Sequence, residues 1–491
     1  MQRFHHLFSG LLIFFSAFAQ AQTPSVTSAI SQSEVEAHIR FLAADEMKGR
    51  DTGTPELKIA ASYIAAQMQS YGVQPVTGAN GYFQSVPLLR QVPPQETTLR
   101  YNDQELSLAE DVIVLEGKNG QKSGGAAYLD FGTAADFEGK DIEGKVVVVK
   151  AGLPGETNPQ TFLTATDEKK KRVLAGGGVA IVELYKSTQI PWALLVRYFS
   201  GERLSLGQET ENEDLPYLWV NDPENQHITA FQNGNPEVSL TISGKAEGEI
   251  NSQNVAGMIE GTDPELKDEY LLITAHYDHV GVETNGNLPD SIYNGARDNG
   301  IGVASLLSAA RYLGQHPPKR SVLFLAVTAE EKGLLGSRWY AQNPLIPMQQ
   351  MVFNLNTDGA GYNDTTKLTI IGLGRTSADE ALQEAARTVG LEAIADPVPE
   401  QNLFDRSDNV NFASMGVPAV TFSPGLTAFD QEITKYYHQL ADEAESLNFN
   451  YIERLCEAFV LSAINIANAE EVPEWEAGDK YESAAQELYG R

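Results

Sequence analysis

Short apolar runs alternate with longer amphipathic segments from about Asn254 onward, and this alternation constrains the fold more than any other feature of the chain. It is typical of an α/β domain with a mainly parallel sheet, in which helices connect successive strands. Apolar residues at helical spacing predict helices over 300–313, 377–389 and 451–467. The runs that predict strands are 270–275, 322–327, 352–355, 368–371 and 419–422.

The chain has 491 residues, 42% of them hydrophobic, which is enough to build more than one buried core. Residues 33–74 have the apolar spacing of two helices, with a polar loop between them. After about residue 106 the pattern changes to short β-rich runs, such as 112–115, 126–129 and 146–149, that alternate with Gly and Asp clusters. This change predicts a separate β-rich module that ends near Gly248.

The first residues have the features of an export signal. Arg3 gives a positive start, residues 7–18 are largely apolar, and residues 19–21 offer small side chains for cleavage. The apolar stretch is shorter than the roughly 20 residues that a membrane-spanning helix needs. We therefore expect cleavage and export to the periplasm or the medium, with no stable membrane anchor. Cys456 is the single cysteine, which excludes an internal disulfide.

The predicted boundaries follow from these changes in pattern. They are 1–21 for the signal peptide, 22–105 for the first part of the main domain, 106–248 for the module, 249–470 for the second part of the main domain and 471–491 for an acidic tail. The tail carries Pro473 and Trp475 among many Glu residues, so it forms either a surface helix or a disordered segment.

The formal net charge of −31 excludes one class of partner. Nucleic acid binding requires a basic face that contacts phosphates, so no nucleic acid partner is expected. Solubility outside the cytoplasm is the simpler explanation of the acidity, although some preference for basic peptides stays open.

Polar side chains cluster where the predicted strands end, which is where open α/β sheets bind their ligands. His276, Tyr277, Asp278 and His279 follow the first strand, Glu330 and Glu331 follow the second, and Asp358 follows the third. Asp298 precedes the predicted helix 300–313, and His438 lies in a loop beyond the strand 419–422. Zinc binds imidazole nitrogen and carboxylate oxygen, and a pair of zinc ions can share a bridging carboxylate. The set matches a two-zinc site.

Each of these residues also has an ordinary structural explanation. A lone histidine after a strand is more often a hydrogen-bonded loop residue, Glu330 and Glu331 resemble a solvated helix start, and Asp298 resembles a helix cap. The metal interpretation is favoured because all of them fall at matching strand ends of one domain. His38, His227, His279 and His316 lack a clear role and are interpreted as structural.

The chain resembles the zinc aminopeptidase family that includes secreted bacterial leucyl aminopeptidases, glutamate carboxypeptidase and the transferrin receptor. The resemblance rests on the metal-ligating set, on the loop of Gly49-Arg50 and 52–54, and on Arg406-Ser407-Asp408 near the expected substrate pocket. Several relatives have His where this chain has Asn409, which leaves a substrate contact there open. The resemblance implies a three-layer α/β/α mixed sheet with an inserted protease-associated domain that covers part of the cleft.

The resemblance also implies the roles of the site residues and two Zn²⁺ per chain. His276 and Asp358 would bind one zinc, Glu331 and His438 the other, and Asp298 would bridge both. Glu330 would be the general base, and Asp278 would hold the second imidazole nitrogen of His276.

The function that this implies is hydrolysis of the N-terminal peptide bond of peptides with a free N-terminus. A carboxypeptidase or dipeptidase acting on acidic peptides is one alternative, but it would need a cluster of arginines, which the sequence does not identify. Glutaminyl cyclase-type acyl transfer is another. A binding protein that has lost catalysis would be expected to lack ligands, and none is missing. Side-chain preference, native metal and oligomeric state stay open.

Overall fold

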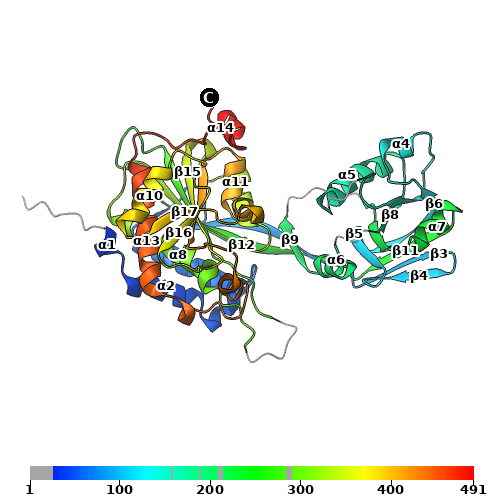
Figure 1. The fold of residues 1–491 in the computed structure, drawn as a ribbon, viewed down its shortest axis with the longest axis horizontal. Coiled ribbons are helices and arrows are strands. Elements are labelled where there is room, and N and C mark those ends of the chain that lie inside the picture. The colour runs from blue at the N-terminus through cyan, green and yellow to red at the C-terminus, as the bar shows by residue number, and fades with distance from the viewer. Residues whose placement is uncertain (1–25, 156–158, 187–189, 208–213, 284–289, 491) are drawn as a thin grey trace, which may run out of the picture.

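The computed structural model describes residues 26–155, 159–186, 190–207, 214–283 and 290–490, arranged as two bodies (Figure 1). We call the larger body the main domain and the smaller one the module. The predicted signal peptide lies outside the described residues. Within the described part of the chain, none of the helices has both the length and the apolar character required to span a membrane.

The main domain is built on a ten-stranded mixed sheet. Its central strands β14, β13, β15 and β18 run parallel, while β16 and β12 flank them in antiparallel orientation. The order across the sheet is β17 (Glu392–Ala395), β16 (Lys367–Ile371), β18 (Ala419–Pro424), β15 (Met351–Thr357), β13 (Tyr270–His276), β14 (Ser321–Val327), β12 (Ala246–Ile259), β2 (Phe83–Val92) and β9 (Arg203–Leu206), with β1 (Gln74–Pro75) paired to β12.

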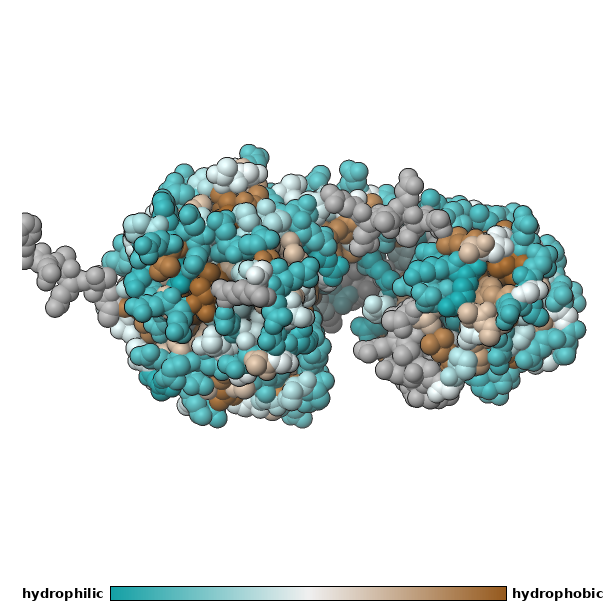
Figure 2. All heavy atoms as spheres, turned by 90° about the horizontal axis from the view of Figure 1, so that it is seen from above, coloured by the Kyte–Doolittle hydropathy of each residue, from teal (hydrophilic) through white to brown (hydrophobic). Residues whose placement is uncertain are grey.

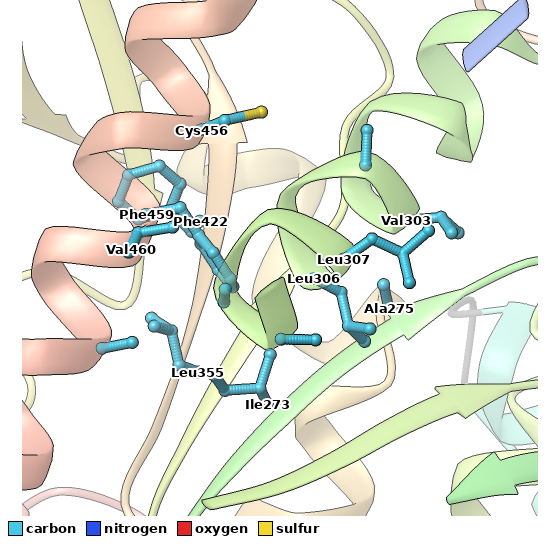
Figure 3. Packing of buried hydrophobic residues seen from close by; sticks show 14 of the residues in the cluster. Ile273, Ala275, Val303, Leu306, Leu307, Leu355, Phe422, Cys456, Phe459 and Val460 are labelled. Atoms are coloured by element: carbon cyan, nitrogen blue, oxygen red, sulfur yellow. The ribbon is translucent and has the colours of Figure 1, made fainter. Parts of the chain in front are cut away.

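Helices cover both faces of this sheet, which gives three layers. One face packs against α2 (Gln32–Leu42), α3 (Pro55–Ser70), α8 (Ile301–Gln315), α10 (Asp379–Thr388) and α13 (Phe449–Asn468). The other packs against α9 (Leu335–Gln342), α11 (Asn409–Ser414) and part of α14 (Glu482–Tyr489). Figure 3 shows Ile273, Leu355 and Phe422 from three strands meeting Leu306 of α8 and Phe459 of α13. Because both faces are covered, the central strands are buried along nearly their whole length, and most of their side chains are apolar.

The predicted strands and helices of the main domain are confirmed, with ends that differ by one to a few residues. The predicted tail is helical in α14, and Trp475 before it is buried against Phe404 and Tyr481. Two further short helices are α1 (Val26–Ala29) and α12 (Gln431–Thr434).

The module is an eight-stranded sheet with two apolar cores, one on each face. Its order is β4 (Gln104–Ser107), β3 (Glu96–Tyr101), β11 (Glu237–Ser243), β6 (Gly120–Tyr128), β7 (Val146–Lys150), β8 (Ala180–Tyr185), β10 (Tyr217–Asn221) and β5 (Val112–Glu116). Its helices are α4 (Ala134–Phe137), α5 (Pro159–Ala175), α6 (Trp192–Phe199) and α7 (Gln226–Gln232).

Two strands belong to a different sheet from the one that the predicted module boundaries imply. β3 precedes residue 106 but pairs with β11, so the module sheet begins at Glu96 and the predicted boundary lies too late. β9 falls inside 106–248 but pairs with β2 in the main sheet. The reason is that a short strand carries only local alternation, which does not encode the sheet that it joins.

β2 and β12 form an antiparallel ribbon that connects the two bodies (Figure 1). The pairing runs from Phe83 opposite Val255 to Val92 opposite Ala246. Figure 2 shows one face of both bodies, which is mostly hydrophilic with scattered apolar patches, as the net charge of −31 suggests.

Candidate metal centre

The site lies where the parallel strands β13, β14 and β15 end. His276 is the last residue of β13, Glu330 and Glu331 follow β14, and Asp358 follows β15. The carboxyl ends of parallel strands share one edge of the sheet, so these side chains converge. His438 reaches the same edge from the loop after α12, in a left-handed backbone conformation (φ 53°).

Asp298 lies in the turn Ala296–Gly300 that leads into α8. The buried carboxylate of Asp442 holds this turn by accepting hydrogen bonds from the backbone N–H of Arg297 (2.9 Å) and of Asp298 (3.2 Å). The Arg297 guanidinium lies 3.6 Å from the centre of the Tyr436 ring. The turn that carries Asp298 is thus tied to the loop that carries His438.

The two carboxylate oxygens of Asp298 face different histidines. Oδ1 lies 3.2 Å from His276 Nε2, and Oδ2 lies 3.2 Å from His438 Nε2. His276 Nε2 is also 3.3 Å from Asp358 Oδ1, and His438 Nε2 is 3.1 Å from Glu331 Oε2. Two groups of ligands therefore share Asp298.

These residues fit two zinc ions by their chemistry. In each group the imidazole and carboxylate atoms lie within 4.8 Å of one another. Among the described residues, neither Lys nor Arg forms an ion pair with Asp298, Glu330, Glu331 or Asp358. The buried negative charge thus exceeds what the chain itself compensates, and cations bound between the two groups would balance it.

Asp278 acts differently from the expectation. His276 Nδ1 lies 3.2 Å from the main-chain carbonyl of Asp278, whereas the Asp278 carboxylate is 4.0 Å away. That carboxylate instead accepts hydrogen bonds from the backbone N–H of Glu330 (3.1 Å), the backbone N–H of Glu331 (3.3 Å) and the hydroxyl of Thr52 (3.2 Å). Burial raises the pKa of Asp278. Its side chain therefore fixes the turn of the two glutamates, and its carbonyl orients His276.

Glu330 lies in the pocket wall beside the metal-ligating residues. Burial raises the pKa of its carboxyl group well above the usual value, the nearby His276 lowers it, and the carboxylate of Asp358 raises it further. A carboxylate with a raised pKa is a better proton acceptor at neutral pH than an exposed one.

Arg50 connects the loops that carry the ligands, a role that the sequence does not indicate beyond the family resemblance. Its fully buried guanidinium donates hydrogen bonds to the carbonyls of Tyr277 (2.9 Å), Asn294 (2.7 Å) and Gly295 (3.0 Å), and also to the carbonyl of Leu42. A side chain at the neighbouring Gly49 would come within 2.3 Å of a main-chain oxygen, so this position requires glycine.

His279 belongs to the site although sequence analysis assigned it a structural role. It lies with Asp298, Glu331 and His438 in one candidate ligand group, and its Nδ1 is 2.8 Å from Glu331 Oε1. The other three histidines lie elsewhere. His38 contacts the hydroxyls of two tyrosines, His227 contacts Tyr101, and His316 packs on Tyr312.

The metal centre opens into a pocket with an apolar wall formed by Ile371, Leu403, Leu426 and Phe429. Every described residue that lines it comes from the main domain, so the described part of the module contributes none of its walls. Figure 1 shows the module extending away along the β2–β12 ribbon.

The segment expected near the substrate pocket divides in two. Arg406 and Ser407 line the pocket, and the Ser407 hydroxyl donates to Asp358 Oδ2 (2.5 Å). Asp408 and Asn409 are fully buried, and Asn409 accepts a hydrogen bond from Thr421 (2.9 Å). Asn409 is therefore part of the packing, which accounts for the absence of a substrate-facing side chain there.

Comparison with known proteins identifies the domain that carries this centre. The model of the family described as Peptidase family M28 matches residues 254–462, a range that contains every predicted metal ligand. The segment 254–462 is thus similar to peptidase family M28. The predicted resemblance is thereby confirmed. The M28 domain begins within β12 and ends within α13, so it comprises the central strands and the ligand loops.

Relatives of the M28 domain are found among curated sequences and solved structures. Aminopeptidase YwaD of Bacillus subtilis is 23% identical over 68% of this chain and 65% of its own length. A vacuolar membrane protease of Candida tropicalis is 34% identical over 27% of this chain and 13% of its length. The chain thus spans less than two thirds of the curated relatives that it matches. An aminopeptidase from Aneurinibacillus superposes with a TM-score of 0.59 at 20% identity, covering 91% of this chain and 96% of that one, which confirms the predicted fold class.

Proposed function

We propose that the chain is a zinc metallo-aminopeptidase that holds two zinc ions and hydrolyses the N-terminal peptide bond of peptides. The observation that carries the proposal is the division of the Asp298 oxygens between His276 and His438, since a carboxylate placed in this way can bridge two ions. His276 and Asp358 complete the first ligand group, and Glu331 and His438 complete the second.

When bound, the zinc ions would lower the pKa of a water molecule and polarise the scissile carbonyl group. Glu330 accepts the proton of the attacking water and delivers it to the leaving amine. Asp278 keeps Glu330 in place by binding its backbone N–H, and its carbonyl orients the His276 ring. The apolar wall of the pocket excludes water around the reacting groups.

The pocket favours an aminopeptidase over a carboxypeptidase. Among the described lining residues Arg406 is the single basic side chain other than histidine, whereas recognition of an acidic dipeptide calls for several. The carboxylates around the centre suit a positively charged N-terminal amine instead. Export to the periplasm or the medium, with peptides as partners, completes the proposal.

The test compares the two neighbouring glutamates. Glu330→Gln should keep two zinc ions and lose about 10²-fold or more in turnover, because the base is removed and the ligands stay. Glu331→Gln, the matched control, should lose zinc. Metal content is measured by mass spectrometry, and turnover by release of amino acids from peptides with free and blocked N-termini.

Several outcomes would contradict the proposal. A Glu330→Gln variant with more than about a tenth of the wild-type rate would remove the assigned base. Hydrolysis of blocked peptides from the C-terminus would indicate a carboxypeptidase, and ammonia released from an N-terminal glutaminyl peptide would indicate a cyclase. A wild-type chain with one zinc ion would contradict the two-metal site.

A further inference from the structure

His279 is fully buried beside the metal centre, and the proposed function gives it no task. Its backbone N–H donates to the carbonyl of Arg50 (3.2 Å), which fixes the main chain at this point. Its side-chain Nδ1 lies 2.8 Å from Glu331 Oε1. This ring could serve only in packing, bind a metal ion, or orient the carboxylate of Glu331.

The two oxygens of Glu331 have separate neighbours. Oε1 faces His279, and Oε2 lies 3.1 Å from His438 Nε2 in the second ligand group. A carboxylate rotates about its last carbon–carbon bond unless both oxygens are held. A hydrogen bond to Oε1 therefore fixes the direction in which Oε2 points.

The His279 ring is closely packed by its neighbours. A side-chain carbon at Gly295 would lie 2.6 Å from His279 Cδ2, so the ring packs directly on the backbone there. Its edge meets the His438 ring, with centroids 5.6 Å apart and planes at 70°. Among the described residues, the buried Nε2 atom has no hydrogen-bond partner. The polar contact of this ring is thus with Glu331.

The hydrogen bond also fixes the tautomer. A carboxylate oxygen only accepts hydrogen bonds, so the proton of a neutral His279 ring lies on Nδ1. A ring that ligated an ion through Nδ1 would have to give up that proton and its hydrogen bond to Glu331. The observed contact of 2.8 Å is a normal hydrogen-bond length.

We infer that His279 is a positioning residue: it donates from Nδ1 to Oε1 of Glu331 and so directs Oε2 toward the second zinc ion. This inference rests on the proposed function, because it requires two metal ions. Groups that orient a metal ligand typically contribute about 10- to 100-fold to metal affinity or activity.

Three variants at position 279 separate the possibilities. His279→Asn keeps an N–H donor close to the position of Nδ1 but is a poor zinc ligand. His279→Leu has a similar shape and no donor. His316→Leu, at a histidine that packs on Tyr312 away from the centre, is the control. Zinc affinities are measured on the full chain by competition with a chromophoric chelator, and the zinc-free proteins are compared by thermal unfolding.

We expect His279→Leu to lower the affinity for one of the two zinc ions, the one held by Glu331 and His438, by about 10- to 100-fold, with His279→Asn and His316→Leu close to wild type. If the leucine variant fails to fold, His279→Gln replaces it, because its amide reaches the position of Nε2 instead of Nδ1.

Equal losses in the asparagine and leucine variants would show that the imidazole is itself a ligand and would overturn the inference. So would unchanged affinity in His279→Leu, or in His279→Gln if that variant replaces it. A wild-type chain that binds fewer than two zinc ions would overturn the proposed function first, before any variant is compared, and the inference with it.

Discussion

Two regions of the molecule bury carboxylates deeply, and they balance the charge in different ways. In the module, Glu183 pairs with the buried Lys169 and accepts hydrogen bonds from Trp219 and from Tyr217 (3.1 Å). We call these four residues the Glu183 cluster. At the metal centre, Asp298 and the other carboxylates face imidazoles and have no Lys or Arg ion pair among the described residues.

This difference separates a structural cluster from a functional one. In the Glu183 cluster, Lys169 supplies a positive charge, and both oxygens of Glu183 accept hydrogen bonds. The Glu183 carboxylate can therefore be buried without a bound cation. The metal centre has more negative charge than its histidines balance, which leaves it dependent on bound cations. Burial of a carboxylate therefore does not by itself indicate a functional site. The source of its counter-charge is the better indicator.

The largest effect is expected at the bridging carboxylate. Asp298→Asn keeps the shape but removes the charge shared by both groups, so zinc content should fall and activity should drop by more than about 10⁴-fold, beyond the loss of a base alone. Asp222→Asn is the matched control, because Asp222 is equally buried but only accepts hydrogen bonds from the start of α7. An Asp298→Asn variant that retained two zinc ions would show that the charge of Asp298 is not needed to hold them, and would contradict the comparison.

A smaller effect is expected in the module. Glu183→Ala leaves the buried Lys169 ammonium without its counter-charge, with only the carbonyl of Lys150 (2.9 Å) as acceptor, which should cost about 3–5 kcal/mol of unfolding free energy. The double variant Lys169→Met with Glu183→Leu should cost less, because it removes both charges. Denaturant unfolding measures the first effect, and metal analysis should find zinc unchanged in both variants. Loss of zinc from Glu183→Ala would show that the Glu183 cluster affects the metal centre, and would contradict its purely structural role.

The smallest effect concerns His38, a buried histidine of the main domain that contacts the hydroxyls of Tyr63 (2.8 Å) and Tyr71 (3.2 Å). Burial lowers its pKa to about 4 from 6.5. The unfolded chain takes up a proton near pH 6.5 and the folded chain only near pH 4, so stability falls as pH drops through this window, by about 3 kcal/mol in total.

His38→Gln removes this titration. The difference in unfolding free energy between wild type and variant should therefore change between pH 7 and pH 4 and stay constant above pH 7. A constant difference across the whole range would show that His38 is protonated in both states or in neither.

Much of the main domain could be predicted from the sequence, for a physical reason. β13, β14 and β15 are covered on both faces, so their sequences are mainly apolar, and polar residues follow each of them. The same ends place His276, Glu331 and Asp358 at one edge, which is why the candidate ligands could be collected before their distances were known.

The remainder depends on contacts that local pattern does not encode. Beyond His276 the chain leaves the extended strand, so alternation no longer tells which way His279 points, and its approach to Glu331 arises from packing on Gly295. The sheet membership of β3 and β9 is likewise decided by distant partners. The Asp278 carboxylate binds a turn 52 residues away, which only the folded chain reveals.

The β2–β12 ribbon has a consequence for how such a chain is built. Leu88 pairs with Ile250 and Val92 with Ala246, so the path that leaves the main domain returns beside its own point of departure. In terms of connectivity the module is one long loop between neighbouring strands, with β9 folded back on the edge of the ribbon. A tight turn could join the same two strands without altering the order of any other strand. The strands whose ends carry the metal ligands are β13, β14 and β15, so none of these ligand positions lies on the inserted segment.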